Sequence, residues 1–79
     1  MLSVTVLTFN RPDLTDVCCH ALETQVRPVT TDIEWLVIDN GSTTPYTRPG
    51  WRVIRSTSNV GGIAGQNLCF ESARGEWVL

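Results

Sequence analysis

The sequence contains no lysine and has no excess of positive charge. All six basic residues are arginines, they are outnumbered by eight acidic residues, and the formal net charge is -2. This balance gives no electrostatic reason to expect binding to nucleic acid or to an anionic membrane. We therefore expect neither as a partner.

Long apolar runs are also missing. No apolar stretch approaches the about 20 residues that a membrane-spanning helix requires. Met1 is followed by a strand pattern rather than by a basic segment and an apolar core, so we expect no signal peptide. These absences predict a chain without a membrane segment and a cytoplasmic location.

Cysteine is scarce, and its spacing is uninformative for metal binding. The chain has Cys18, Cys19 and Cys69, which is an odd number, and no two of them have the spacing of metal ligands. We expect reduced thiols that are mostly buried as small hydrophobes. The sequence predicts no metal site and no cofactor held by these residues.

The length of 79 residues suits one small domain with a thin core. Leu2 to Phe9 is rich in β-branched residues and reads as a strand. Pro12 then opens a helix that we expect to end near Gln25. Its apolar stripe is predicted to comprise Leu14, Val17, Cys18, Ala21 and Leu22.

The second half of the chain repeats this alternation. Ile33 to Asp39 is apolar on both faces, which is typical of a strand covered on both sides of a parallel sheet. Residues 43–50, with two prolines, are predicted to form a surface loop, and Trp51 to Ser56 a third strand. A second helix begins near Gly61 and is predicted to bury Gly65, Leu68, Cys69, Ser72 and Ala73, with Gly75 as its cap.

A fourth strand is expected from Glu76 to Leu79, which completes a β-α-β-β-α-β order. This alternation predicts an α/β fold with a mainly parallel, Rossmann-like sheet in the order 3-2-1-4. Such an order places a switch point between the first and fourth strands, and ligands bind beyond the carboxyl ends of the strands at such a point.

Polar residues follow the first two strands at this edge. The first strand ends in Thr8-Phe9-Asn10-Arg11 and the second in Asp39-Asn40-Gly41-Ser42. A carboxylate there can accept hydrogen bonds from a nucleobase or a sugar, an aromatic ring can stack on a base, and an arginine can reach a phosphate. Asp-Asn-Gly-Ser is also a good turn sequence, and taken alone the segment favours that interpretation.

Four segments in this order resemble glycosyltransferases of family 2, which have the GT-A fold. They are "SVTVLTFNRPDL", "IEWLVIDNGST", "RVIRSTSNVGGIAGQNL" and "ARGEWVL". The resemblance runs from about Ser3 to Leu79. It implies that residues 1–79 are the single, truncated nucleotide-sugar-binding part of a GT-A domain.

The resemblance also implies which residues contact the nucleotide. Asp39 matches an acid that typically bonds the nucleobase, and Gln66 departs from the arginine that many members carry before the helix asparagine. The nucleotide-binding set expected here is Thr8, Phe9, Asn10, Arg11, Asp39, Asn40, Ser42, Asn59, Gly61 and Asn67.

The family's metal-binding Asp-x-Asp motif and its catalytic base fall outside the matching segments. We therefore expect no catalytic residue and no metal ligand in this chain. A full-length member is expected to use Mg²⁺ or Mn²⁺ and to transfer sugar from a nucleoside-diphosphate sugar to a glycan or lipid-linked acceptor.

Three interpretations stay open at this point. The chain is the N-terminal segment of such an enzyme, a catalytically inactive nucleotide-binding remnant, or a non-functional fragment. Nucleotide affinity without sugar transfer would distinguish the second from the first. Aggregation without stabilisation by nucleotide would point to the third.

Overall fold

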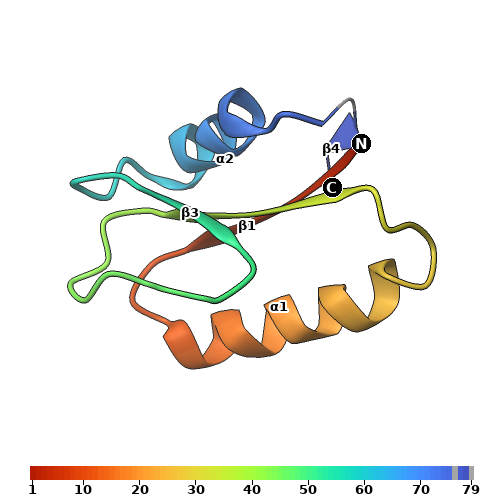
Figure 1. The fold of residues 1–79 in the computed structure, drawn as a ribbon. Helices are drawn as coiled ribbons and strands as arrows, with labels where there is room; N and C mark the ends of the chain where they lie inside the picture. The colour runs from red at the N-terminus through yellow and green to blue at the C-terminus, as the bar shows by residue number, and fades with distance from the viewer. Residues whose placement is uncertain (76, 79) are drawn as a thin grey trace.

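An open parallel sheet lies between two helices in the computed structural model, which describes residues 1–75 and 77–78 (Figure 1). Its elements, in chain order, are β1 (Leu2–Thr8), α1 (Pro12–Val26), β2 (Ile33–Asp39), β3 (Arg52–Arg55), α2 (Gly62–Ser72) and β4 (Trp77–Val78). The strands described run in the order β3-β2-β1-β4, and each described pair is parallel. The predicted α/β class and parallel sheet are confirmed; Glu76 and Leu79 of the predicted fourth strand lie outside the described residues.

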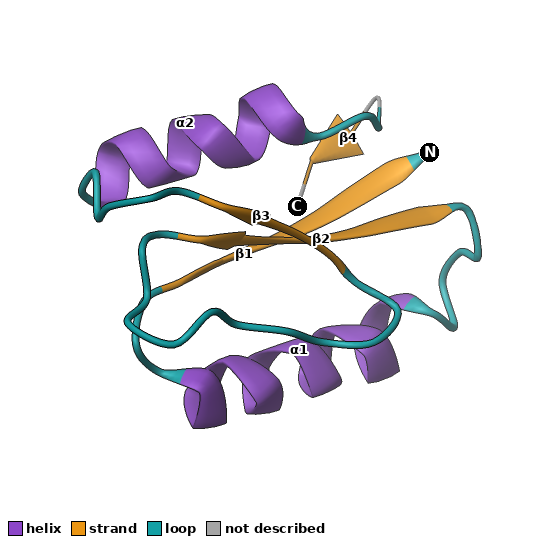
Figure 2. Ribbon diagram, turned by 60° about the vertical axis from the view of Figure 1, so that its left-hand side comes forward, coloured by secondary structure: helices purple, strands orange, loops and turns teal. Residues whose placement is uncertain are grey.

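The two faces of β2 explain why the sheet is covered on both sides. Trp35 and Val37 belong to the core on the α1 side, whereas Leu36 and Ile38 belong to the core on the α2 side. Figure 2 shows the two helices on opposite faces of the sheet. Apolar residues on both faces of β2 are therefore buried or, for Trp35, half-buried, as expected of a strand covered on both sides.

The predicted apolar stripe of α1 is wrong by about one position. Leu14, Val17 and Cys18 are exposed, and the buried residues of the helix are Thr15, Cys19 and Val26, with Leu22 half-buried. One residue corresponds to a rotation of about 100° around a helix. Thr15 can face the sheet because its hydroxyl lies 2.6 Å from Thr8 Oγ1 and donates to the Arg11 carbonyl at 2.8 Å.

The predicted buried stripe of α2 is largely confirmed, but its predicted cap is not. Gly65 and Cys69 are buried, and Leu68 is half-buried. The C-cap of the helix is Ala73 rather than Gly75. Gly75 instead meets the start of β1, where an added Cβ would lie 2.6 Å from Ser3 Oγ, so this position requires a residue without a side chain.

A half-buried carboxylate ties this region to the amino-terminal edge of the sheet. Glu34 Oε1 accepts hydrogen bonds from the Ser3 hydroxyl and the Arg74 N–H, both at 2.8 Å. Burial opposes ionisation of Glu34, but these hydrogen bonds and the nearby charge of Arg52 outweigh it and lower its pKa. Glu34 therefore holds the end of α2 against β1.

The three cysteines carry free thiols, as expected. Cys19 and Cys69 are buried on opposite faces of the sheet, and Cys18 is exposed on α1. Burial raises the pKa of both buried thiols, so they are packing residues at neutral pH.

Candidate functional site

The carboxyl ends of β1 and β2 meet at one edge of the sheet, and most of the predicted site residues lie there. Thr8, the last residue of β1, pairs with Asp39, the last residue of β2. The Asn40 N–H then donates to the Thr8 carbonyl at 2.8 Å. The two polar segments are therefore side by side, as their positions after parallel strands predicted.

Asp39 is fully buried, and its carboxylate holds the β2–β3 loop (residues 40–51). Oδ1 accepts a hydrogen bond from the Ser42 N–H at 3.0 Å, and Oδ2 accepts one from the Tyr46 N–H at 2.9 Å. Arg55 Nε lies 3.8 Å from Oδ2. Burial opposes ionisation, but the hydrogen bonds from Ser42 and Tyr46 and the charge of Arg55 outweigh it and lower the pKa of Asp39.

These contacts bear on whether the Asp39 segment is a turn or part of a site. Both carboxylate oxygens are used by backbone N–H groups of the following loop, which is how an aspartate stabilises a turn. The turn is nevertheless part of the edge, because it fixes Ser42 next to the end of β1. The direct contact of Asp39 with a nucleobase stays a prediction.

Asn10 links the end of β1 to the same loop. Its backbone has a positive φ of 54°, a conformation in which asparagine is enriched. Its N–H donates to Ser42 Oγ at 2.9 Å, and its Oδ1 accepts from the Thr43 N–H at 2.7 Å. Asn10 and Ser42 thus form one rigid junction between two segments that are more than thirty positions apart in the chain.

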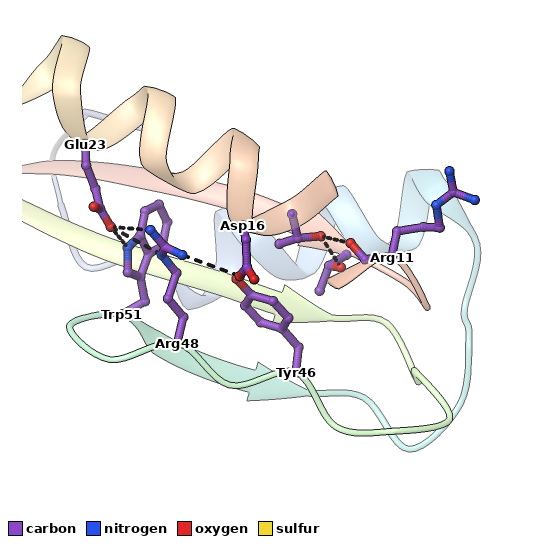
Figure 3. A network of polar contacts seen from close by, with 8 residues as sticks. Arg11, Asp16, Glu23, Tyr46, Arg48 and Trp51 are labelled. Atoms are coloured by element: carbon purple, nitrogen blue, oxygen red, sulfur yellow. Dashed lines mark hydrogen bonds and ion pairs between the residues drawn. The ribbon is translucent and has the colours of Figure 1, made fainter. Parts of the chain in front are cut away.

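The β2–β3 loop is also tied to α1 by a network of side chains (Figure 3). Tyr46 Oη donates to Asp16 Oδ1 at 2.6 Å. Arg48 forms ion pairs with Asp16 at 3.4 Å and with Glu23 at 3.1 Å, and Trp51 Nε1 donates to Glu23 Oε1 at 2.7 Å. The hydrogen bond from Trp51 and the contacts with Arg48 lower the pKa of Glu23 despite partial burial.

A cavity of about 450 Å³ lies between this loop and the start of α1. Its walls combine hydroxyl, amide and carboxylate groups with two proline rings. The lining residues are Thr8, Asn10, Pro12, Asp16, Ser42, Thr43, Thr44, Pro45, Tyr46 and Thr47. Three residues of the predicted set, Thr8, Asn10 and Ser42, therefore share one cavity wall.

The β3–α2 loop (residues 56–61) forms the other side of the edge. Asn40 Nδ2 donates to Asn59 Oδ1 at 3.3 Å and to the Gly61 carbonyl at 3.2 Å, while Asn40 Oδ1 accepts from the Val60 N–H at 3.0 Å. The structure thus brings Asn40, Asn59 and Gly61 together. Gly65 packs closely against Asn40 and Leu7, because an added Cβ would lie 3.1 Å from Asn40 Nδ2 and 2.8 Å from Leu7 Cδ1.

Three predicted residues, Phe9, Arg11 and Asn67, lie outside both the cavity-lining group and the group around Asn40. Phe9 is 42% exposed directly after β1, and Arg11 is exposed before α1; both line a smaller hollow on the outer side of β1. Asn67 is exposed on α2, and no described hydrogen bond joins it to the two groups. Its part in a site stays a prediction.

Sequence reasoning missed the residues that shape the cavity from the β2–β3 loop and α1. The prolines indicated a plain surface loop, yet Tyr46 is buried and Asp16 reaches across from the helix. A lone tyrosine within a polar loop was the available signal. The partner of Tyr46 could not be found from spacing, because thirty positions separate the two residues.

Carboxylates do not gather at this edge in the part of the chain that the structure describes. Within residues 1–75 and 77–78 there is no group of three histidine, cysteine, aspartate or glutamate side chains that could hold a metal ion. Hard cations such as Mg²⁺ are held by several oxygen ligands, and Asp39 already uses its oxygens for the loop. The described residues therefore do not fit a metal centre.

Comparison with protein families decides the affiliation of the chain. A family model described as glycosyl transferase family 2 matches residues 3–79. The chain belongs to glycosyl transferase family 2. No curated protein and no solved structure gives a significant match. Among its described residues, this family 2 chain has no helix that is both long and apolar enough to cross a membrane.

Proposed function

We propose that the chain is the nucleotide-binding part of a GT-A glycosyltransferase domain that uses a nucleoside-diphosphate sugar. Family membership over residues 3–79 supports the kind of enzyme. The observation that carries the location is the convergence of three segments at one edge: the end of β1 and the two loops held by Asp39 and Asn40. Ligands of open parallel sheets bind at this edge.

The proposed ligand lies over the end of β1, between the two loops. Phe9 is positioned to stack on a planar base because its ring is partly exposed directly after the strand. Exposed Arg11 supplies a charge that can pair with a phosphate. Thr8, Asn10 and Ser42 supply hydroxyl and amide groups on one side, and Asn40, Asn59 and Gly61 shape the other.

Asp39 has a defined role in this proposal even though it is buried. Its carboxylate holds Ser42 and Tyr46 in place and so fixes the loop against which the nucleoside lies. A direct hydrogen bond to a base would require this loop to open. We therefore propose that Asp39 acts on the ligand through the loop, as a positioning residue.

We infer that these 79 residues bind nucleotide without transferring sugar. Transfer needs a cation at the departing diphosphate and a base for the acceptor hydroxyl. A full-length member would bring Mg²⁺ or Mn²⁺ and an acceptor glycan or lipid through residues other than those described. The inactive nucleotide-binding remnant is the second candidate.

The test is a calorimetric and NMR titration of the chain with UDP, GDP, ADP and dTDP, with and without Mg²⁺. We expect one nucleoside diphosphate to bind without a requirement for metal, with amide shifts confined to residues 8–11, 40–46 and 59–61. Phe9→Ala and Arg11→Ala should weaken binding by roughly tenfold each, because they remove a stacking surface and a phosphate contact. Val29→Ala is the matched control, since Val29 is 81% exposed and lies outside both loops.

Two results would overturn the proposal. The first is an absence of binding by all four nucleotides while the chain is folded. The second is binding with shifts at the amino-terminal edge, around Glu34 and Gly75. Binding that appears only with Mg²⁺ would contradict the expected binding without metal.

A further inference from the structure

Asp16 gives the cavity beside the β2–β3 loop a single charged group. The cavity measures about 450 Å³, which lies within the size range of small-molecule sites. Among the described residues that line it, Asp16 is the one with a charged side chain, and the others are prolines or carry hydroxyl or amide groups. A phosphate would therefore meet a negative charge here without a positive one. The cavity suits an uncharged part of a ligand that donates hydrogen bonds.

The Asp16 carboxylate is accessible to such a ligand. Its side chain is 56% exposed, and Figure 3 shows it reaching from α1 toward the β2–β3 loop. Oδ1 accepts a hydrogen bond from Tyr46 Oη at 2.6 Å and lies 3.4 Å from Arg48 Nη1. Both contacts use Oδ1, and within residues 1–75 and 77–78 the structure shows no hydrogen bond or ion pair at Oδ2. A ligand can thus bind Asp16 without displacing Tyr46.

The same carboxylate is held in a fixed position. Tyr46 is buried, its N–H donates to the Asp39 carboxylate at 2.9 Å, and its hydroxyl donates to Asp16. Arg48 adds one ion pair to Asp16 and a second one to Glu23. A polar group that cannot turn away discriminates more strongly between ligands, because a mismatched ligand group is left facing it.

An ionised carboxylate distinguishes nucleobases by what their edges donate, because it can accept hydrogen bonds but cannot donate them. On its Watson–Crick edge, guanine presents two neighbouring N–H donors, which match the two oxygens of a carboxylate. Uracil and thymine present one N–H between two carbonyl oxygens, and adenine and cytosine present an amino group beside a ring nitrogen that accepts. Each of these four bases would place an acceptor against the carboxylate, which is unfavourable.

We propose that Asp16 selects guanine as the base of the nucleotide bound at the candidate site. This inference rests on the proposed function and adds the identity of the base. Thr8 lines both the cavity and the smaller hollow that Phe9 and Arg11 border, so the two adjoin at the end of β1. In the proposed complex, a nucleotide held by Phe9 and Arg11 turns the free edge of its base toward Asp16.

The first test is a calorimetric titration of the chain with GDP, UDP, ADP and dTDP without metal. We expect GDP to bind roughly tenfold or more tightly than the other three, because another base loses a hydrogen bond to a charged group. Equal affinity for GDP and UDP, or a preference for another nucleotide, would overturn the selection of guanine and leave the proposed function standing. Binding of none of the four by the folded chain would overturn both.

The second test compares GDP with xanthosine 5′-diphosphate in wild type and in Asp16→Asn. Xanthine carries a carbonyl oxygen where guanine carries its amino group, so it matches a side-chain amide, which both donates and accepts. We expect wild type to favour GDP and Asp16→Asn to favour the xanthine nucleotide, with the ratio of the two dissociation constants changing by roughly 100-fold. Asparagine can still accept the Tyr46 hydrogen bond, so a merely structural role of Asp16 would affect both nucleotides alike.

Asp13→Asn is the matched control. Asp13 is exposed in the first turn of the same helix, carries the same charge and is not among the residues that line the cavity. This variant should keep the wild-type preference for GDP. An unchanged preference in Asp16→Asn, or an equal change in Asp13→Asn, would overturn the proposal. Circular dichroism of each variant separates a change in base preference from loss of the fold.

Discussion

The β2–β3 loop and the β3–α2 loop border the same edge of the sheet, yet they are held by different means. The first is anchored from below by the buried charge of Asp39 and from the side by Tyr46, Arg48 and Trp51. The described anchoring of the second comes mainly from the amide of Asn40. One side of the edge is therefore built into the core, and the other is held mainly by one neutral side chain.

Rigidity and adaptability are placed on different sides of this edge. Hydrogen bonds to a charged group contribute more to stability than bonds to a neutral amide. The β2–β3 loop should therefore open only with global unfolding, whereas the β3–α2 loop should open locally. A ligand that contacts both loops would be positioned by the rigid β2–β3 loop. The same ligand would reduce the motion of the β3–α2 loop.

Asp39→Ala should have the largest effect. It leaves two backbone N–H groups and Arg55 without their buried partner, and we expect a loss of about 3 kcal/mol in the free energy of unfolding. Urea denaturation followed by tryptophan fluorescence measures it. A loss below about 1 kcal/mol, the size of one ordinary hydrogen bond, would show that the loop is not anchored by this carboxylate.

The pH dependence of stability provides the control for this variant. The pKa of Asp39 is lowered in the folded chain, so its stabilising contribution is present above the unfolded pKa and is lost as pH falls through the folded value. Wild-type stability should thus decrease below about pH 4. Asp39→Ala should show a shallower decrease, with the remainder arising from Glu23 and Glu34.

Asn40→Ala should have the next largest effect. We expect a loss of about 2 kcal/mol in the free energy of unfolding, because the Val60 N–H and the Gly61 carbonyl lose their partner. The sharper readout is hydrogen exchange: the Val60 amide should exchange much faster, while the Tyr46 amide stays protected. Equal acceleration at both amides would remove the distinction between the two loops. Thr44→Ala serves as the control, since Thr44 is exposed.

Tyr46→Phe should lower the free energy of unfolding by about 1 kcal/mol, because it removes the hydrogen bond to Asp16 and keeps the buried ring. The β2–β3 loop should remain in place, since the Tyr46 N–H still reaches Asp39. Thermal unfolding and the near-ultraviolet circular dichroism of the aromatic residues measure both expectations. A loss as large as that of Asp39→Ala would mean that α1, rather than the buried charge, anchors the loop.

Ser56→Ala should have the smallest effect, a few tenths of a kcal/mol, because its hydroxyl donates to the Ser58 carbonyl in an exposed position. Chemical denaturation should place it within error of wild type. A loss above about 1 kcal/mol would show that the β3–α2 loop has an anchor of its own and would weaken the comparison.

The sequence predicted the parts of the fold that follow from local pattern. The apolar run of β2 has residues on both faces, and this is sufficient to predict a parallel sheet covered on both sides. It also predicted that the ends of β1 and β2 meet, because parallel strands bring their carboxyl ends to one edge.

The remainder depended on tertiary contacts that no local pattern encodes. The stripe of α1 was placed one position away because apolarity alone favoured Leu14 over Thr15, whose hydroxyl is satisfied by Thr8 only in the folded chain. The cavity was missed for the same reason, since Tyr46 meets Asp16 across thirty positions. Glycine at position 75 was interpreted as a cap, whereas it permits close approach to Ser3.

The amino-terminal edge of the sheet, opposite the two loops, has a practical consequence. Met1 lies at the amino-terminal edge, where its ammonium group pairs with Asp32 at 3.2 Å. The seven residues of β1 separate this edge from the loops by roughly 20 Å. A surface linker attached ahead of Met1 would therefore present the two loops to solution, and immobilisation by that end leaves the candidate site accessible.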